Sequence, residues 1–315
     1  MKKLIITIDT EGDNQWEWKP GKKITTENSR YLERFQRLCD RYNFKPTWLT
    51  NYEMLMDDYY LKFISKVISE GHGEAGLHIH GWNNPPDYNL KNETGEAPYL
   101  IEYPIEIMEE KIASMIDVFK NKLGVAPVSH RAGRWAMDER YFDLLIKYGI
   151  GVDCSVTPGV NWQLCKGAGK NFGGTNYIGY PSKPYMVDST RGEGSVLEVP
   201  VSIFHTHRLN IPDKLSLKNI LKAVYHGIKG ENIWLRPHQG NTESMLMMID
   251  KMECTDADYI MFMIHSSELM PGGSPNFPTT ESIESLYNVL EKLWERLSGS
   301  YEGITLADYA QSKCI

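Results

Sequence analysis

Short apolar runs alternate with longer amphipathic stretches along almost the whole chain, and this alternation is the feature that most constrains the fold. The first run, LIITID at 4–9, is followed by a helical pattern at 27–41 and by a second run, PTWLT at 46–50. Parallel strands are usually joined by crossover helices, so a repeat of this step indicates a parallel sheet. The predicted strands cover 4–9, 46–50, 74–80, 128–133, 151–156, 196–202, 232–236 and 259–265, and the predicted helices cover 27–41, 60–69, 105–124, 139–148, 214–228, 242–252 and 279–297.

Eight predicted strands favour a closed or nearly closed (β/α) barrel over an open doubly wound sheet. No G-x-G-x-x-G fingerprint follows the first strand and no phosphate-loop motif is present, which disfavours the usual open-sheet functions. We therefore predict an α/β fold, a single distorted barrel of seven to eight βα units over 1–315. The stretches 82–103 and 157–195 are rich in Gly, Pro, Asn and aromatic residues, and we predict that they are loops bordering a site.

Charge and hydropathy exclude several classes of protein. The net charge of -7 argues against a general binder of nucleic acid or of anionic membranes. The first apolar run stops at Asp9, which is too early for a signal peptide, and no apolar stretch approaches the roughly 20 residues that span a bilayer. The five cysteines are scattered and never spaced C-x-x-C, so we expect reduced thiols and a cytoplasmic protein without membrane insertion.

Polar residues collect where the predicted strands end, and in parallel α/β folds these carboxyl ends face the site. Residues two apart on a strand point to the same face, so two such residues can be directed at one point. Two carboxylates and two imidazoles that converge form a site suited to zinc or another divalent transition metal. The strand-end residues are Asp9, Glu11, His78, His80, His130, Arg131, Asp153 and His265.

Each of these residues also has an ordinary structural explanation. A single histidine at a strand end is more often a hydrogen-bonded structural residue than a ligand, and Asp9 could cap the following helix. Arg131 and Asp153 could form a structural ion pair. The joint pattern favours a site, because buried charges at several strand ends are costly unless they pair or bind something. His205, His207 and His238 follow later strands and could border the same site or serve as loop hydrogen-bonding groups.

Five short motifs occur in an order that resembles the polysaccharide deacetylases of carbohydrate esterase family four. They are TIDTEGD, HIHGW, HRAGRW, GVDCS and MFMIHSSEL, and the resemblance extends from Leu4 to about Leu297. The block RAGRW, VDCSV and HSSELMPGGSP is similar to a divergent subgroup associated with cell-surface glycan biosynthesis. The fold implied by this resemblance is the family's distorted barrel.

The resemblance implies a role for each motif residue. It makes Asp9 the general base, Arg131 the residue that orients it, Asp153 the support of the catalytic histidine, and His265 that histidine. The metal ligands that it implies are Glu11, His78 and His80.

Two departures from the family pattern bear on these roles. The first motif usually has adjacent aspartates, whereas here Thr10 separates Asp9 from Glu11. The second usually spaces its histidines four apart, and Trp82 stands at that place. Either His80 takes the second ligand role or the metal site is degraded.

The implied activity is metal-dependent hydrolysis of an N-acetyl group on an amino sugar of a glycan or glycan precursor, with zinc as the expected ion. Trp82, Trp135 and Trp162 are expected to stack on the sugar, with Tyr180 and Tyr185 as lesser candidates, although each could simply anchor a loop. An acetylated amino sugar is the expected partner, and the sequence predicts neither its identity nor the oligomeric state.

Two other functions remain open at this point. An amidohydrolase also uses an H-x-H motif, but there it lies on the first strand, whereas here it lies on the third. A non-catalytic relative that only binds glycans is favoured by the tryptophan at position 82.

Overall fold

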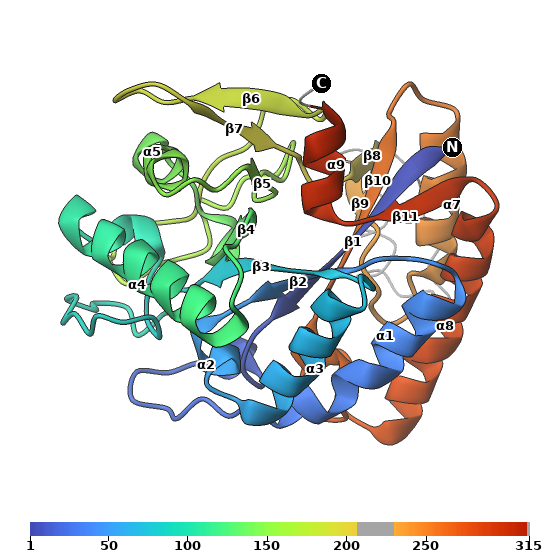
Figure 1. Ribbon diagram of the computed structural model, residues 1–315, viewed down its shortest axis with the longest axis horizontal. Helices are drawn as coiled ribbons and strands as arrows, with labels where there is room; N and C mark the ends of the chain where they lie inside the picture. The colour runs from blue at the N-terminus through green and yellow to red at the C-terminus, as the bar shows by residue number, and fades with distance from the viewer. Residues whose placement is uncertain (207–229, 314–315) are drawn as a thin grey trace, which may run out of the picture.

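The computed structural model describes residues 1–206 and 230–313, and its central element is a curled, largely parallel sheet (Figure 1). Within this described part the sheet has nine strands in the order β10-β1-β2-β3-β4-β5-β7-β6, and β11 pairs with β1. Only the β6–β7 pair is antiparallel. The strands are β1 (Lys2–Thr10), β2 (Thr47–Thr50), β3 (Glu74–Ile79), β4 (Ser129–Ala132), β5 (Val152–Asp153), β6 (Tyr185–Asp188), β7 (Ser195–Glu198), β10 (Tyr259–His265) and β11 (Tyr301–Ile304).

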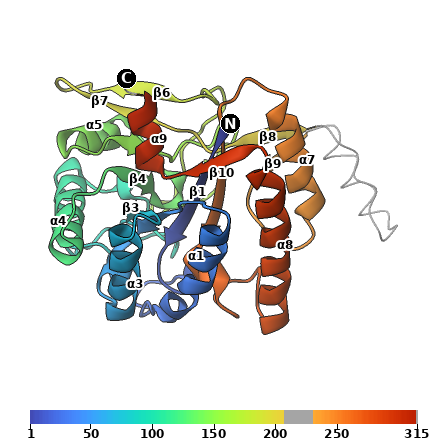
Figure 2. The same cartoon turned by 45° about the vertical axis from the view of Figure 1, so that its right-hand side comes forward.

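Helices cover the outer face of this sheet. Figures 1 and 2 show α1, α3, α4 and α8 around the outside of its curve. The helices are α1 (Leu32–Arg41), α2 (Tyr52–Leu55), α3 (Asp58–Ser69), α4 (Ile105–Leu123), α5 (Glu139–Lys147), α7 (Thr242–Glu253), α8 (Thr280–Ser298) and α9 (Leu306–Lys313). The predicted α/β fold with a distorted barrel is therefore confirmed, in the form of a curled half-barrel sheet. The predicted helix at 214–228 lies outside the described residues.

The barrel is open on one side, where the predicted strand at 232–236 joins a different sheet. Its residues form β9 (Glu231–Trp234), which pairs antiparallel with β8 (Ile203–Thr206). Only Leu235, just after β9, makes a parallel bridge to Phe262 of β10. The closed barrel that eight strands would allow is not formed, since this single bridge is the contact with β10, whereas the length of β9 pairs with β8.

The outer layer is an apolar core built from alternate strand residues and the helix faces. Leu4, Ile6 and Ile8 of β1 are fully buried against this layer. The ring of Trp294 from α8 stands 4.8 Å from that of Phe262, in an edge contact. Burying each such side chain contributes about 1.5–3 kcal/mol, which holds the helices on the sheet.

The inner face of the sheet is apolar at one end and polar at the other. Ile5, Met261 and Met263 form the apolar part, together with Leu306 and Tyr309 of α9. Helix α9 is fixed at the amino-terminal ends of the strands, since the backbone N–H of Leu306 donates to the first residue of β2. With that end filled, the inner face is free for chemistry at the carboxyl ends.

The elements that sequence reasoning missed are short. They include β6, β8, β11, α2 and α9. In β11, Gly303 packs so closely on Phe44 that a Cβ added to the glycine would be 2.6 Å from the Cα atom of Phe44. The close packing requires a glycine, and glycine has a low strand propensity, so the sequence did not indicate a strand here. In the described residues no helix has the length and apolar character needed to cross a membrane.

Candidate metal and catalytic site

The carboxyl ends of β1, β3, β4 and β10 surround one cleft of about 220 Å³, which we call the strand-end cleft. Strand parity explains why their polar residues meet there. Along β1 and just beyond it, the inward-facing residues Ile5, Asp9 and Glu11 alternate with outward-facing ones. His78 on β3 and His80 just after it also face inward. The cleft is lined by Asp9, Glu11, Gln15, Trp16, Trp18, His78, His80, Trp82, Glu96, Ala97, Arg134, Trp135 and His265.

Three of these residues present buried ligand atoms to a common point. The Nε2 atoms of His78 and His80 are 3.1 Å apart, and Glu11 Oε2 lies 3.4 Å from the first and 2.7 Å from the second. Nitrogen and oxygen ligands lie about 2.0–2.1 Å from Zn²⁺, so two of them in a tetrahedral site are about 3.3 Å apart. This donor set therefore fits a divalent transition metal. Among the described residues it is the one group of three or more such side chains close enough to share an ion.

Hydrogen bonding and stacking orient the two imidazoles. His78 Nδ1 lies 3.0 Å from the carbonyl oxygen of Arg131, so Nδ1–H donates and Nε2 is left bare to bind an ion. The ring of His80 lies against that of Trp82, with centroids 4.1 Å apart. Gly133 packs against the Nδ1 side of the His80 ring, since a Cβ added to this glycine would be 2.3 Å from Nδ1. Trp82 thus holds His80 in the ligand cluster and is not itself part of it.

The charge states of two of these ligands, Glu11 and His80, suit metal binding. Burial acts to raise the pKa of Glu11, but its hydrogen bonds with His78 and His80 lower the pKa by more than burial raises it. The pKa of Glu11 therefore lies below its ordinary value. Burial lowers the pKa of His80 to about 4. Burial also acts to lower the pKa of His78, yet the carboxylates of Asp9 and Glu11 raise it above its ordinary value. An ionised carboxylate and a neutral His80 are the forms that bind a cation.

Asp9 forms a buried ion pair beside the ligands. Its Oδ1 lies 2.6 Å from Nη1 of Arg131, and both side chains are almost wholly buried. Burial raises the pKa of Asp9, while the Arg131 guanidinium and His78 lower it more, so the net pKa is depressed. Arg131 is itself held by the carbonyl oxygen of Cys154, to which its Nε donates at 3.2 Å. Asp9 is therefore an ionised carboxylate with its second oxygen directed at His265.

His265 completes the cleft and takes its carboxylate partner from the next turn of the chain. Its Nε2 is 3.8 Å from Asp9 Oδ2, and its Nδ1 is 3.1 Å from Oε2 of Glu268. Burial raises the pKa of Glu268, but the Arg236 guanidinium and His265 lower it to about 2. An ionised Glu268 can accept a hydrogen bond from Nδ1–H, and Nε2 faces the cleft. Sequence reasoning missed Glu268, although the H-S-S-E spacing brings the fourth residue back over the first across a helical turn.

The predicted contact between Asp153 and His265 is not formed. Val152 and Cys154 pack in the inner apolar cluster, so the intervening Asp153 side chain points to the opposite, helix-covered face. There it accepts a 2.6 Å hydrogen bond from Nδ1 of His130. Asp153 thus belongs to a structural network on the outer face. The carboxylate that contacts His265 is Glu268, in the position that we predicted for Asp153.

The three predicted tryptophans do not share one site. Trp82 and Trp135 line the strand-end cleft, whereas Trp162 lines a separate groove. Two tryptophans that we did not predict take part: the Trp16 ring is 4.9 Å from that of His265, and the Trp18 ring is 5.4 Å from that of Trp82. The segment QWEWKP, which begins one residue after TIDTEGD, was the available signal, because its two tryptophans lie two residues apart.

Those of the weaker histidine and tyrosine candidates that the structure describes lie away from the cleft. His205 is exposed, and its Nδ1 is 2.8 Å from Oδ1 of Asn232. His238 borders the groove that contains Trp162, and His207 lies outside the described residues. Tyr180 packs edge-on against Tyr177. The other lesser candidate, Tyr185, begins β6 at the far edge of the sheet.

Arg134 joins the two long loops at the rim of the cleft. It donates to the carbonyl oxygens of Ala97 and Lys166, and its guanidinium lies 4.0 Å from the Tyr99 ring centroid. Arg134 and Trp135 both have left-handed backbones, with φ of 56° and 61°. Such conformations cost about 1–3 kcal/mol each and persist where the surroundings hold them. The strained turn directs both side chains into the cleft.

Comparisons with known proteins define the fold and no more. No family model matches the sequence, and no curated protein matches it. Among solved structures, a protein described as a polysaccharide deacetylase from Mycobacterium smegmatis has a TM-score of 0.52 at 14% identity, covering 99% of this chain and 90% of that one. A protein described as a glycoside hydrolase/deacetylase from Parabacteroides distasonis has a TM-score of 0.58 at 12% identity, covering 98% and 70%.

The same fold also carries another activity. An allantoinase has a TM-score of 0.54 at 12% identity, covering 98% of this chain and 88% of that one. Function must therefore be argued from the site. The chain has the distorted (β/α) barrel fold of the polysaccharide deacetylases.

Proposed function

We propose that this chain is a metal-dependent hydrolase that removes an N-acetyl group from an amino sugar of a glycan or glycan precursor. One observation carries the proposal: the buried donor set of Glu11, His78 and His80 lies beside an ionised Asp9 and a histidine, His265, on the other side of the same cleft. The deacetylases among the structural neighbours support it. From the sequence resemblance we further propose that the glycan is one of the cell surface.

A divalent cation, with zinc expected, would be held by Glu11 Oε2 and by Nε2 of His78 and His80. When bound, such an ion polarises the acetamide carbonyl and makes the attacking water more acidic. The hydrogen bond from His78 to the Arg131 carbonyl fixes one ligand, and the stacking of Trp82 fixes the other imidazole.

Asp9 and His265 would divide the proton transfers between them. Asp9, kept ionised by Arg131, takes the proton from the water as it attacks the carbonyl carbon. His265 then gives a proton from Nε2 to the departing amine, which is otherwise a poor leaving group. Glu268 acts through His265 by accepting a hydrogen bond from its Nδ1–H, which orients the ring.

The aromatic side chains of the cleft would bind the sugar. Trp16 and Trp82 provide ring surfaces on either side of the catalytic groups. Two buried polar atoms in the cleft, Trp82 Nε1 and Gln15 Oε1, have no hydrogen-bond partner within the chain. Sugar hydroxyl and acetamide groups supply the acceptor and the donor that these atoms lack.

The allantoinase among the neighbours supports a second candidate, a hydrolase of a non-sugar amide. The H-x-H pair lies on β3, whereas Asp9 and Glu11 lie on and just after β1, which separates this site from the amidohydrolase pattern that we considered. A non-catalytic glycan-binding relative is the third candidate. The position of His80 within the donor set argues against it, because the ligand missing at Trp82 is replaced.

Acetate release tests the proposal. Chelator-treated protein is reconstituted with one equivalent of Zn²⁺ and incubated with N-acetylated glucosamine oligomers, and separately with cyclic amides. We expect acetate from the oligomers only with the ion present. Hydrolysis of cyclic amides alone would favour the second candidate, and sugar binding without acetate release would favour the third.

A further inference from the structure

A second hollow of about 470 Å³ opens beside the strand-end cleft, and we call it the Trp162–Trp234 groove. Its walls come from the segment after β5, which carries Trp162, and from β9 and the residues that follow it, which carry Trp234, Arg236 and His238. Its volume lies within the roughly 300–1,000 Å³ typical of small-molecule sites. The segment that carries Trp162 follows the carboxyl end of β5, and Arg236 follows the carboxyl end of β9, so the groove reaches the same end of the barrel as the cleft.

Side chains that line the groove contact side chains that line the cleft. The Trp135 ring, which lines the cleft, is 5.7 Å from the Trp234 ring, which is 6.2 Å from the Trp162 ring. Three indoles in successive edge contacts thus run from one hollow to the other. Arg236 lines the groove and places its Nη2 3.2 Å from Nδ1 of His265 in the cleft. A ligand that extends from the cleft past His265 would enter this groove.

The chemistry of the groove favours an uncharged sugar. Trp162 and Trp234 are only partly buried, so ring surface remains open, and indole faces bind the C–H surface of a sugar ring. The Arg236 guanidinium is already 3.5 Å from the buried Glu268 carboxylate, so its charge is balanced within the protein. The Nδ2 group of Asn232 stands in the wall and can donate a hydrogen bond to a hydroxyl group, whereas the amide of Asn241 is bonded to the backbone of Arg236 and His238.

We propose that the Trp162–Trp234 groove is a second carbohydrate subsite, which binds the neutral sugar unit next to the acetylated unit held in the cleft. The substrate is then an oligosaccharide or polymer of at least two units. This inference rests on the proposed function, because it takes the cleft as the place where the acetylated unit reacts.

Kinetics on substrates of increasing length test the inference. N-acetylated β-1,4-linked glucosamine oligomers of one, two and four units are compared in the wild type, Trp162→Ala and Trp162→Phe. We expect Trp162→Ala to raise KM for the two- and four-unit substrates about 5- to 10-fold, the size of one aromatic stacking contact, and to leave the one-unit substrate unchanged. Trp162→Phe keeps a ring and should restore most of the loss. Tyr59→Ala, at an exposed aromatic residue between α1 and α3, is the matched control and should change nothing.

Calorimetric titration of the four-unit oligomer separates this inference from the proposed function. Binding that Trp162→Ala weakens, in a protein that releases no acetate, would support the groove and overturn the deacetylase. Acetate release with equal KM for all lengths and no effect of Trp162→Ala would overturn the groove alone. An effect of Trp162→Ala on a nucleotide-linked N-acetylglucosamine but not on the oligomers would also overturn it. Melting temperatures show whether the variants are folded.

Discussion

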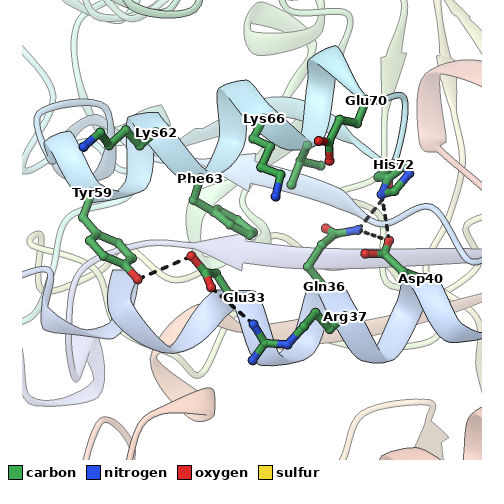
Figure 3. Close-up of a pocket in the computed structure, with 11 residues that line it drawn as sticks. Glu33, Gln36, Arg37, Asp40, Tyr59, Lys62, Phe63, Lys66, Glu70 and His72 are labelled. Atoms are coloured by element: carbon green, nitrogen blue, oxygen red, sulfur yellow. Dashed lines mark hydrogen bonds and ion pairs between the residues drawn. The ribbon is translucent and has the colours of Figure 1, made fainter.

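The strand-end cleft and the groove between α1 and α3 are two hollows of the same molecule with opposite internal chemistry. The groove between α1 and α3, which we call the helix groove, has a volume of about 380 Å³, and the cleft has about 220 Å³. Several polar residues of the helix groove pair with one another, as Figure 3 shows: Glu33 lies 3.3 Å from Arg37, and Gln36 donates to Asp40 at 2.9 Å. Among the described side chains that line it, none is a buried polar group without a partner.

The cleft holds polar groups that the chain does not satisfy. His80 Nδ1, Trp82 Nε1 and Gln15 Oε1 are buried without hydrogen-bond partners. Three ligand atoms of Glu11, His78 and His80 are crowded together with little solvent contact. Buried polar groups of this kind are costly unless something outside the protein pairs with them. The contrast teaches that unmet buried polarity marks the functional hollow better than its size.

The largest effect should follow loss of a ligand from the cleft. We expect His80→Ala to reduce bound metal from about one equivalent to a small fraction and deacetylation by at least about 10³-fold, because the ion contributes several kcal/mol of charge stabilisation. Metal analysis after dialysis and acetate release measure the two effects.

The matched control is His72→Ala, which removes an exposed histidine beside Asp40 in the helix groove and should change neither quantity. Equal effects of the two substitutions would erase the contrast between the hollows.

The second-largest effect should follow removal of the proposed general base, Asp9. We expect Asp9→Asn to lower kcat about 10²- to 10⁴-fold, the range typical of a lost general base, while metal binding is retained. Because Arg131 and His78 depress the pKa of Asp9, the contribution of Asp9 to the wild-type rate should be lost only as the pH drops through that lowered value. The variant lacks this titration. Asp40→Asn, in the helix groove, is the control, and a full rate in Asp9→Asn would contradict the role.

The third prediction concerns Glu268 and the pH dependence of the unfolding free energy. Its pKa is about 2 against an ordinary 4.5, so its ionised form stabilises the fold above pH 4.5, and this contribution is lost as the pH falls toward 2. The shift corresponds to about 3 kcal/mol of unfolding free energy at neutral pH. Urea unfolding at pH 7 and pH 3 should therefore show a smaller pH dependence in Glu268→Gln than in the wild type.

The same substitution should slow deacetylation about 10- to 100-fold, since His265 loses the acceptor that fixes its ring. Glu33→Gln, at a largely exposed carboxylate, is the control for both measurements. An identical pH dependence of stability in Glu268→Gln and the wild type would show that the low pKa is not realised.

Much of the fold was predictable because it depends on local sequence. The runs at 4–9, 74–80 and 259–265 became β1, β3 and β10 with boundaries close to those predicted. Spacing of two also placed Asp9 with Glu11 and His78 with His80, since strand parity is a local property. The fate of the run at 232–236 was not predictable, because it was decided by pairing with β8, which is a tertiary contact.

The misassigned residues failed for the same physical reason. Nothing in GVDCS states whether Asp153 or its neighbours face inward, and the structure turns Asp153 to the outer face. Glu268 reaches His265 only because a short helical turn follows β10. Trp162 shares a loop with no catalytic residue, so its distance from the cleft depends on how that loop packs on β9.

The smallest effect should come from an ion pair of the helix groove. Arg37 and Glu33 are both more than half exposed, with side-chain exposures of 68% and 53%, so water screens their attraction. We expect Arg37→Ala to change the unfolding free energy by no more than about 0.5 kcal/mol and to leave deacetylation unchanged. Urea unfolding and acetate release measure both. A loss of activity comparable to that of Asp9→Asn would show that the satisfied groove also takes part in function, and that unmet buried polarity is not what separates the two hollows.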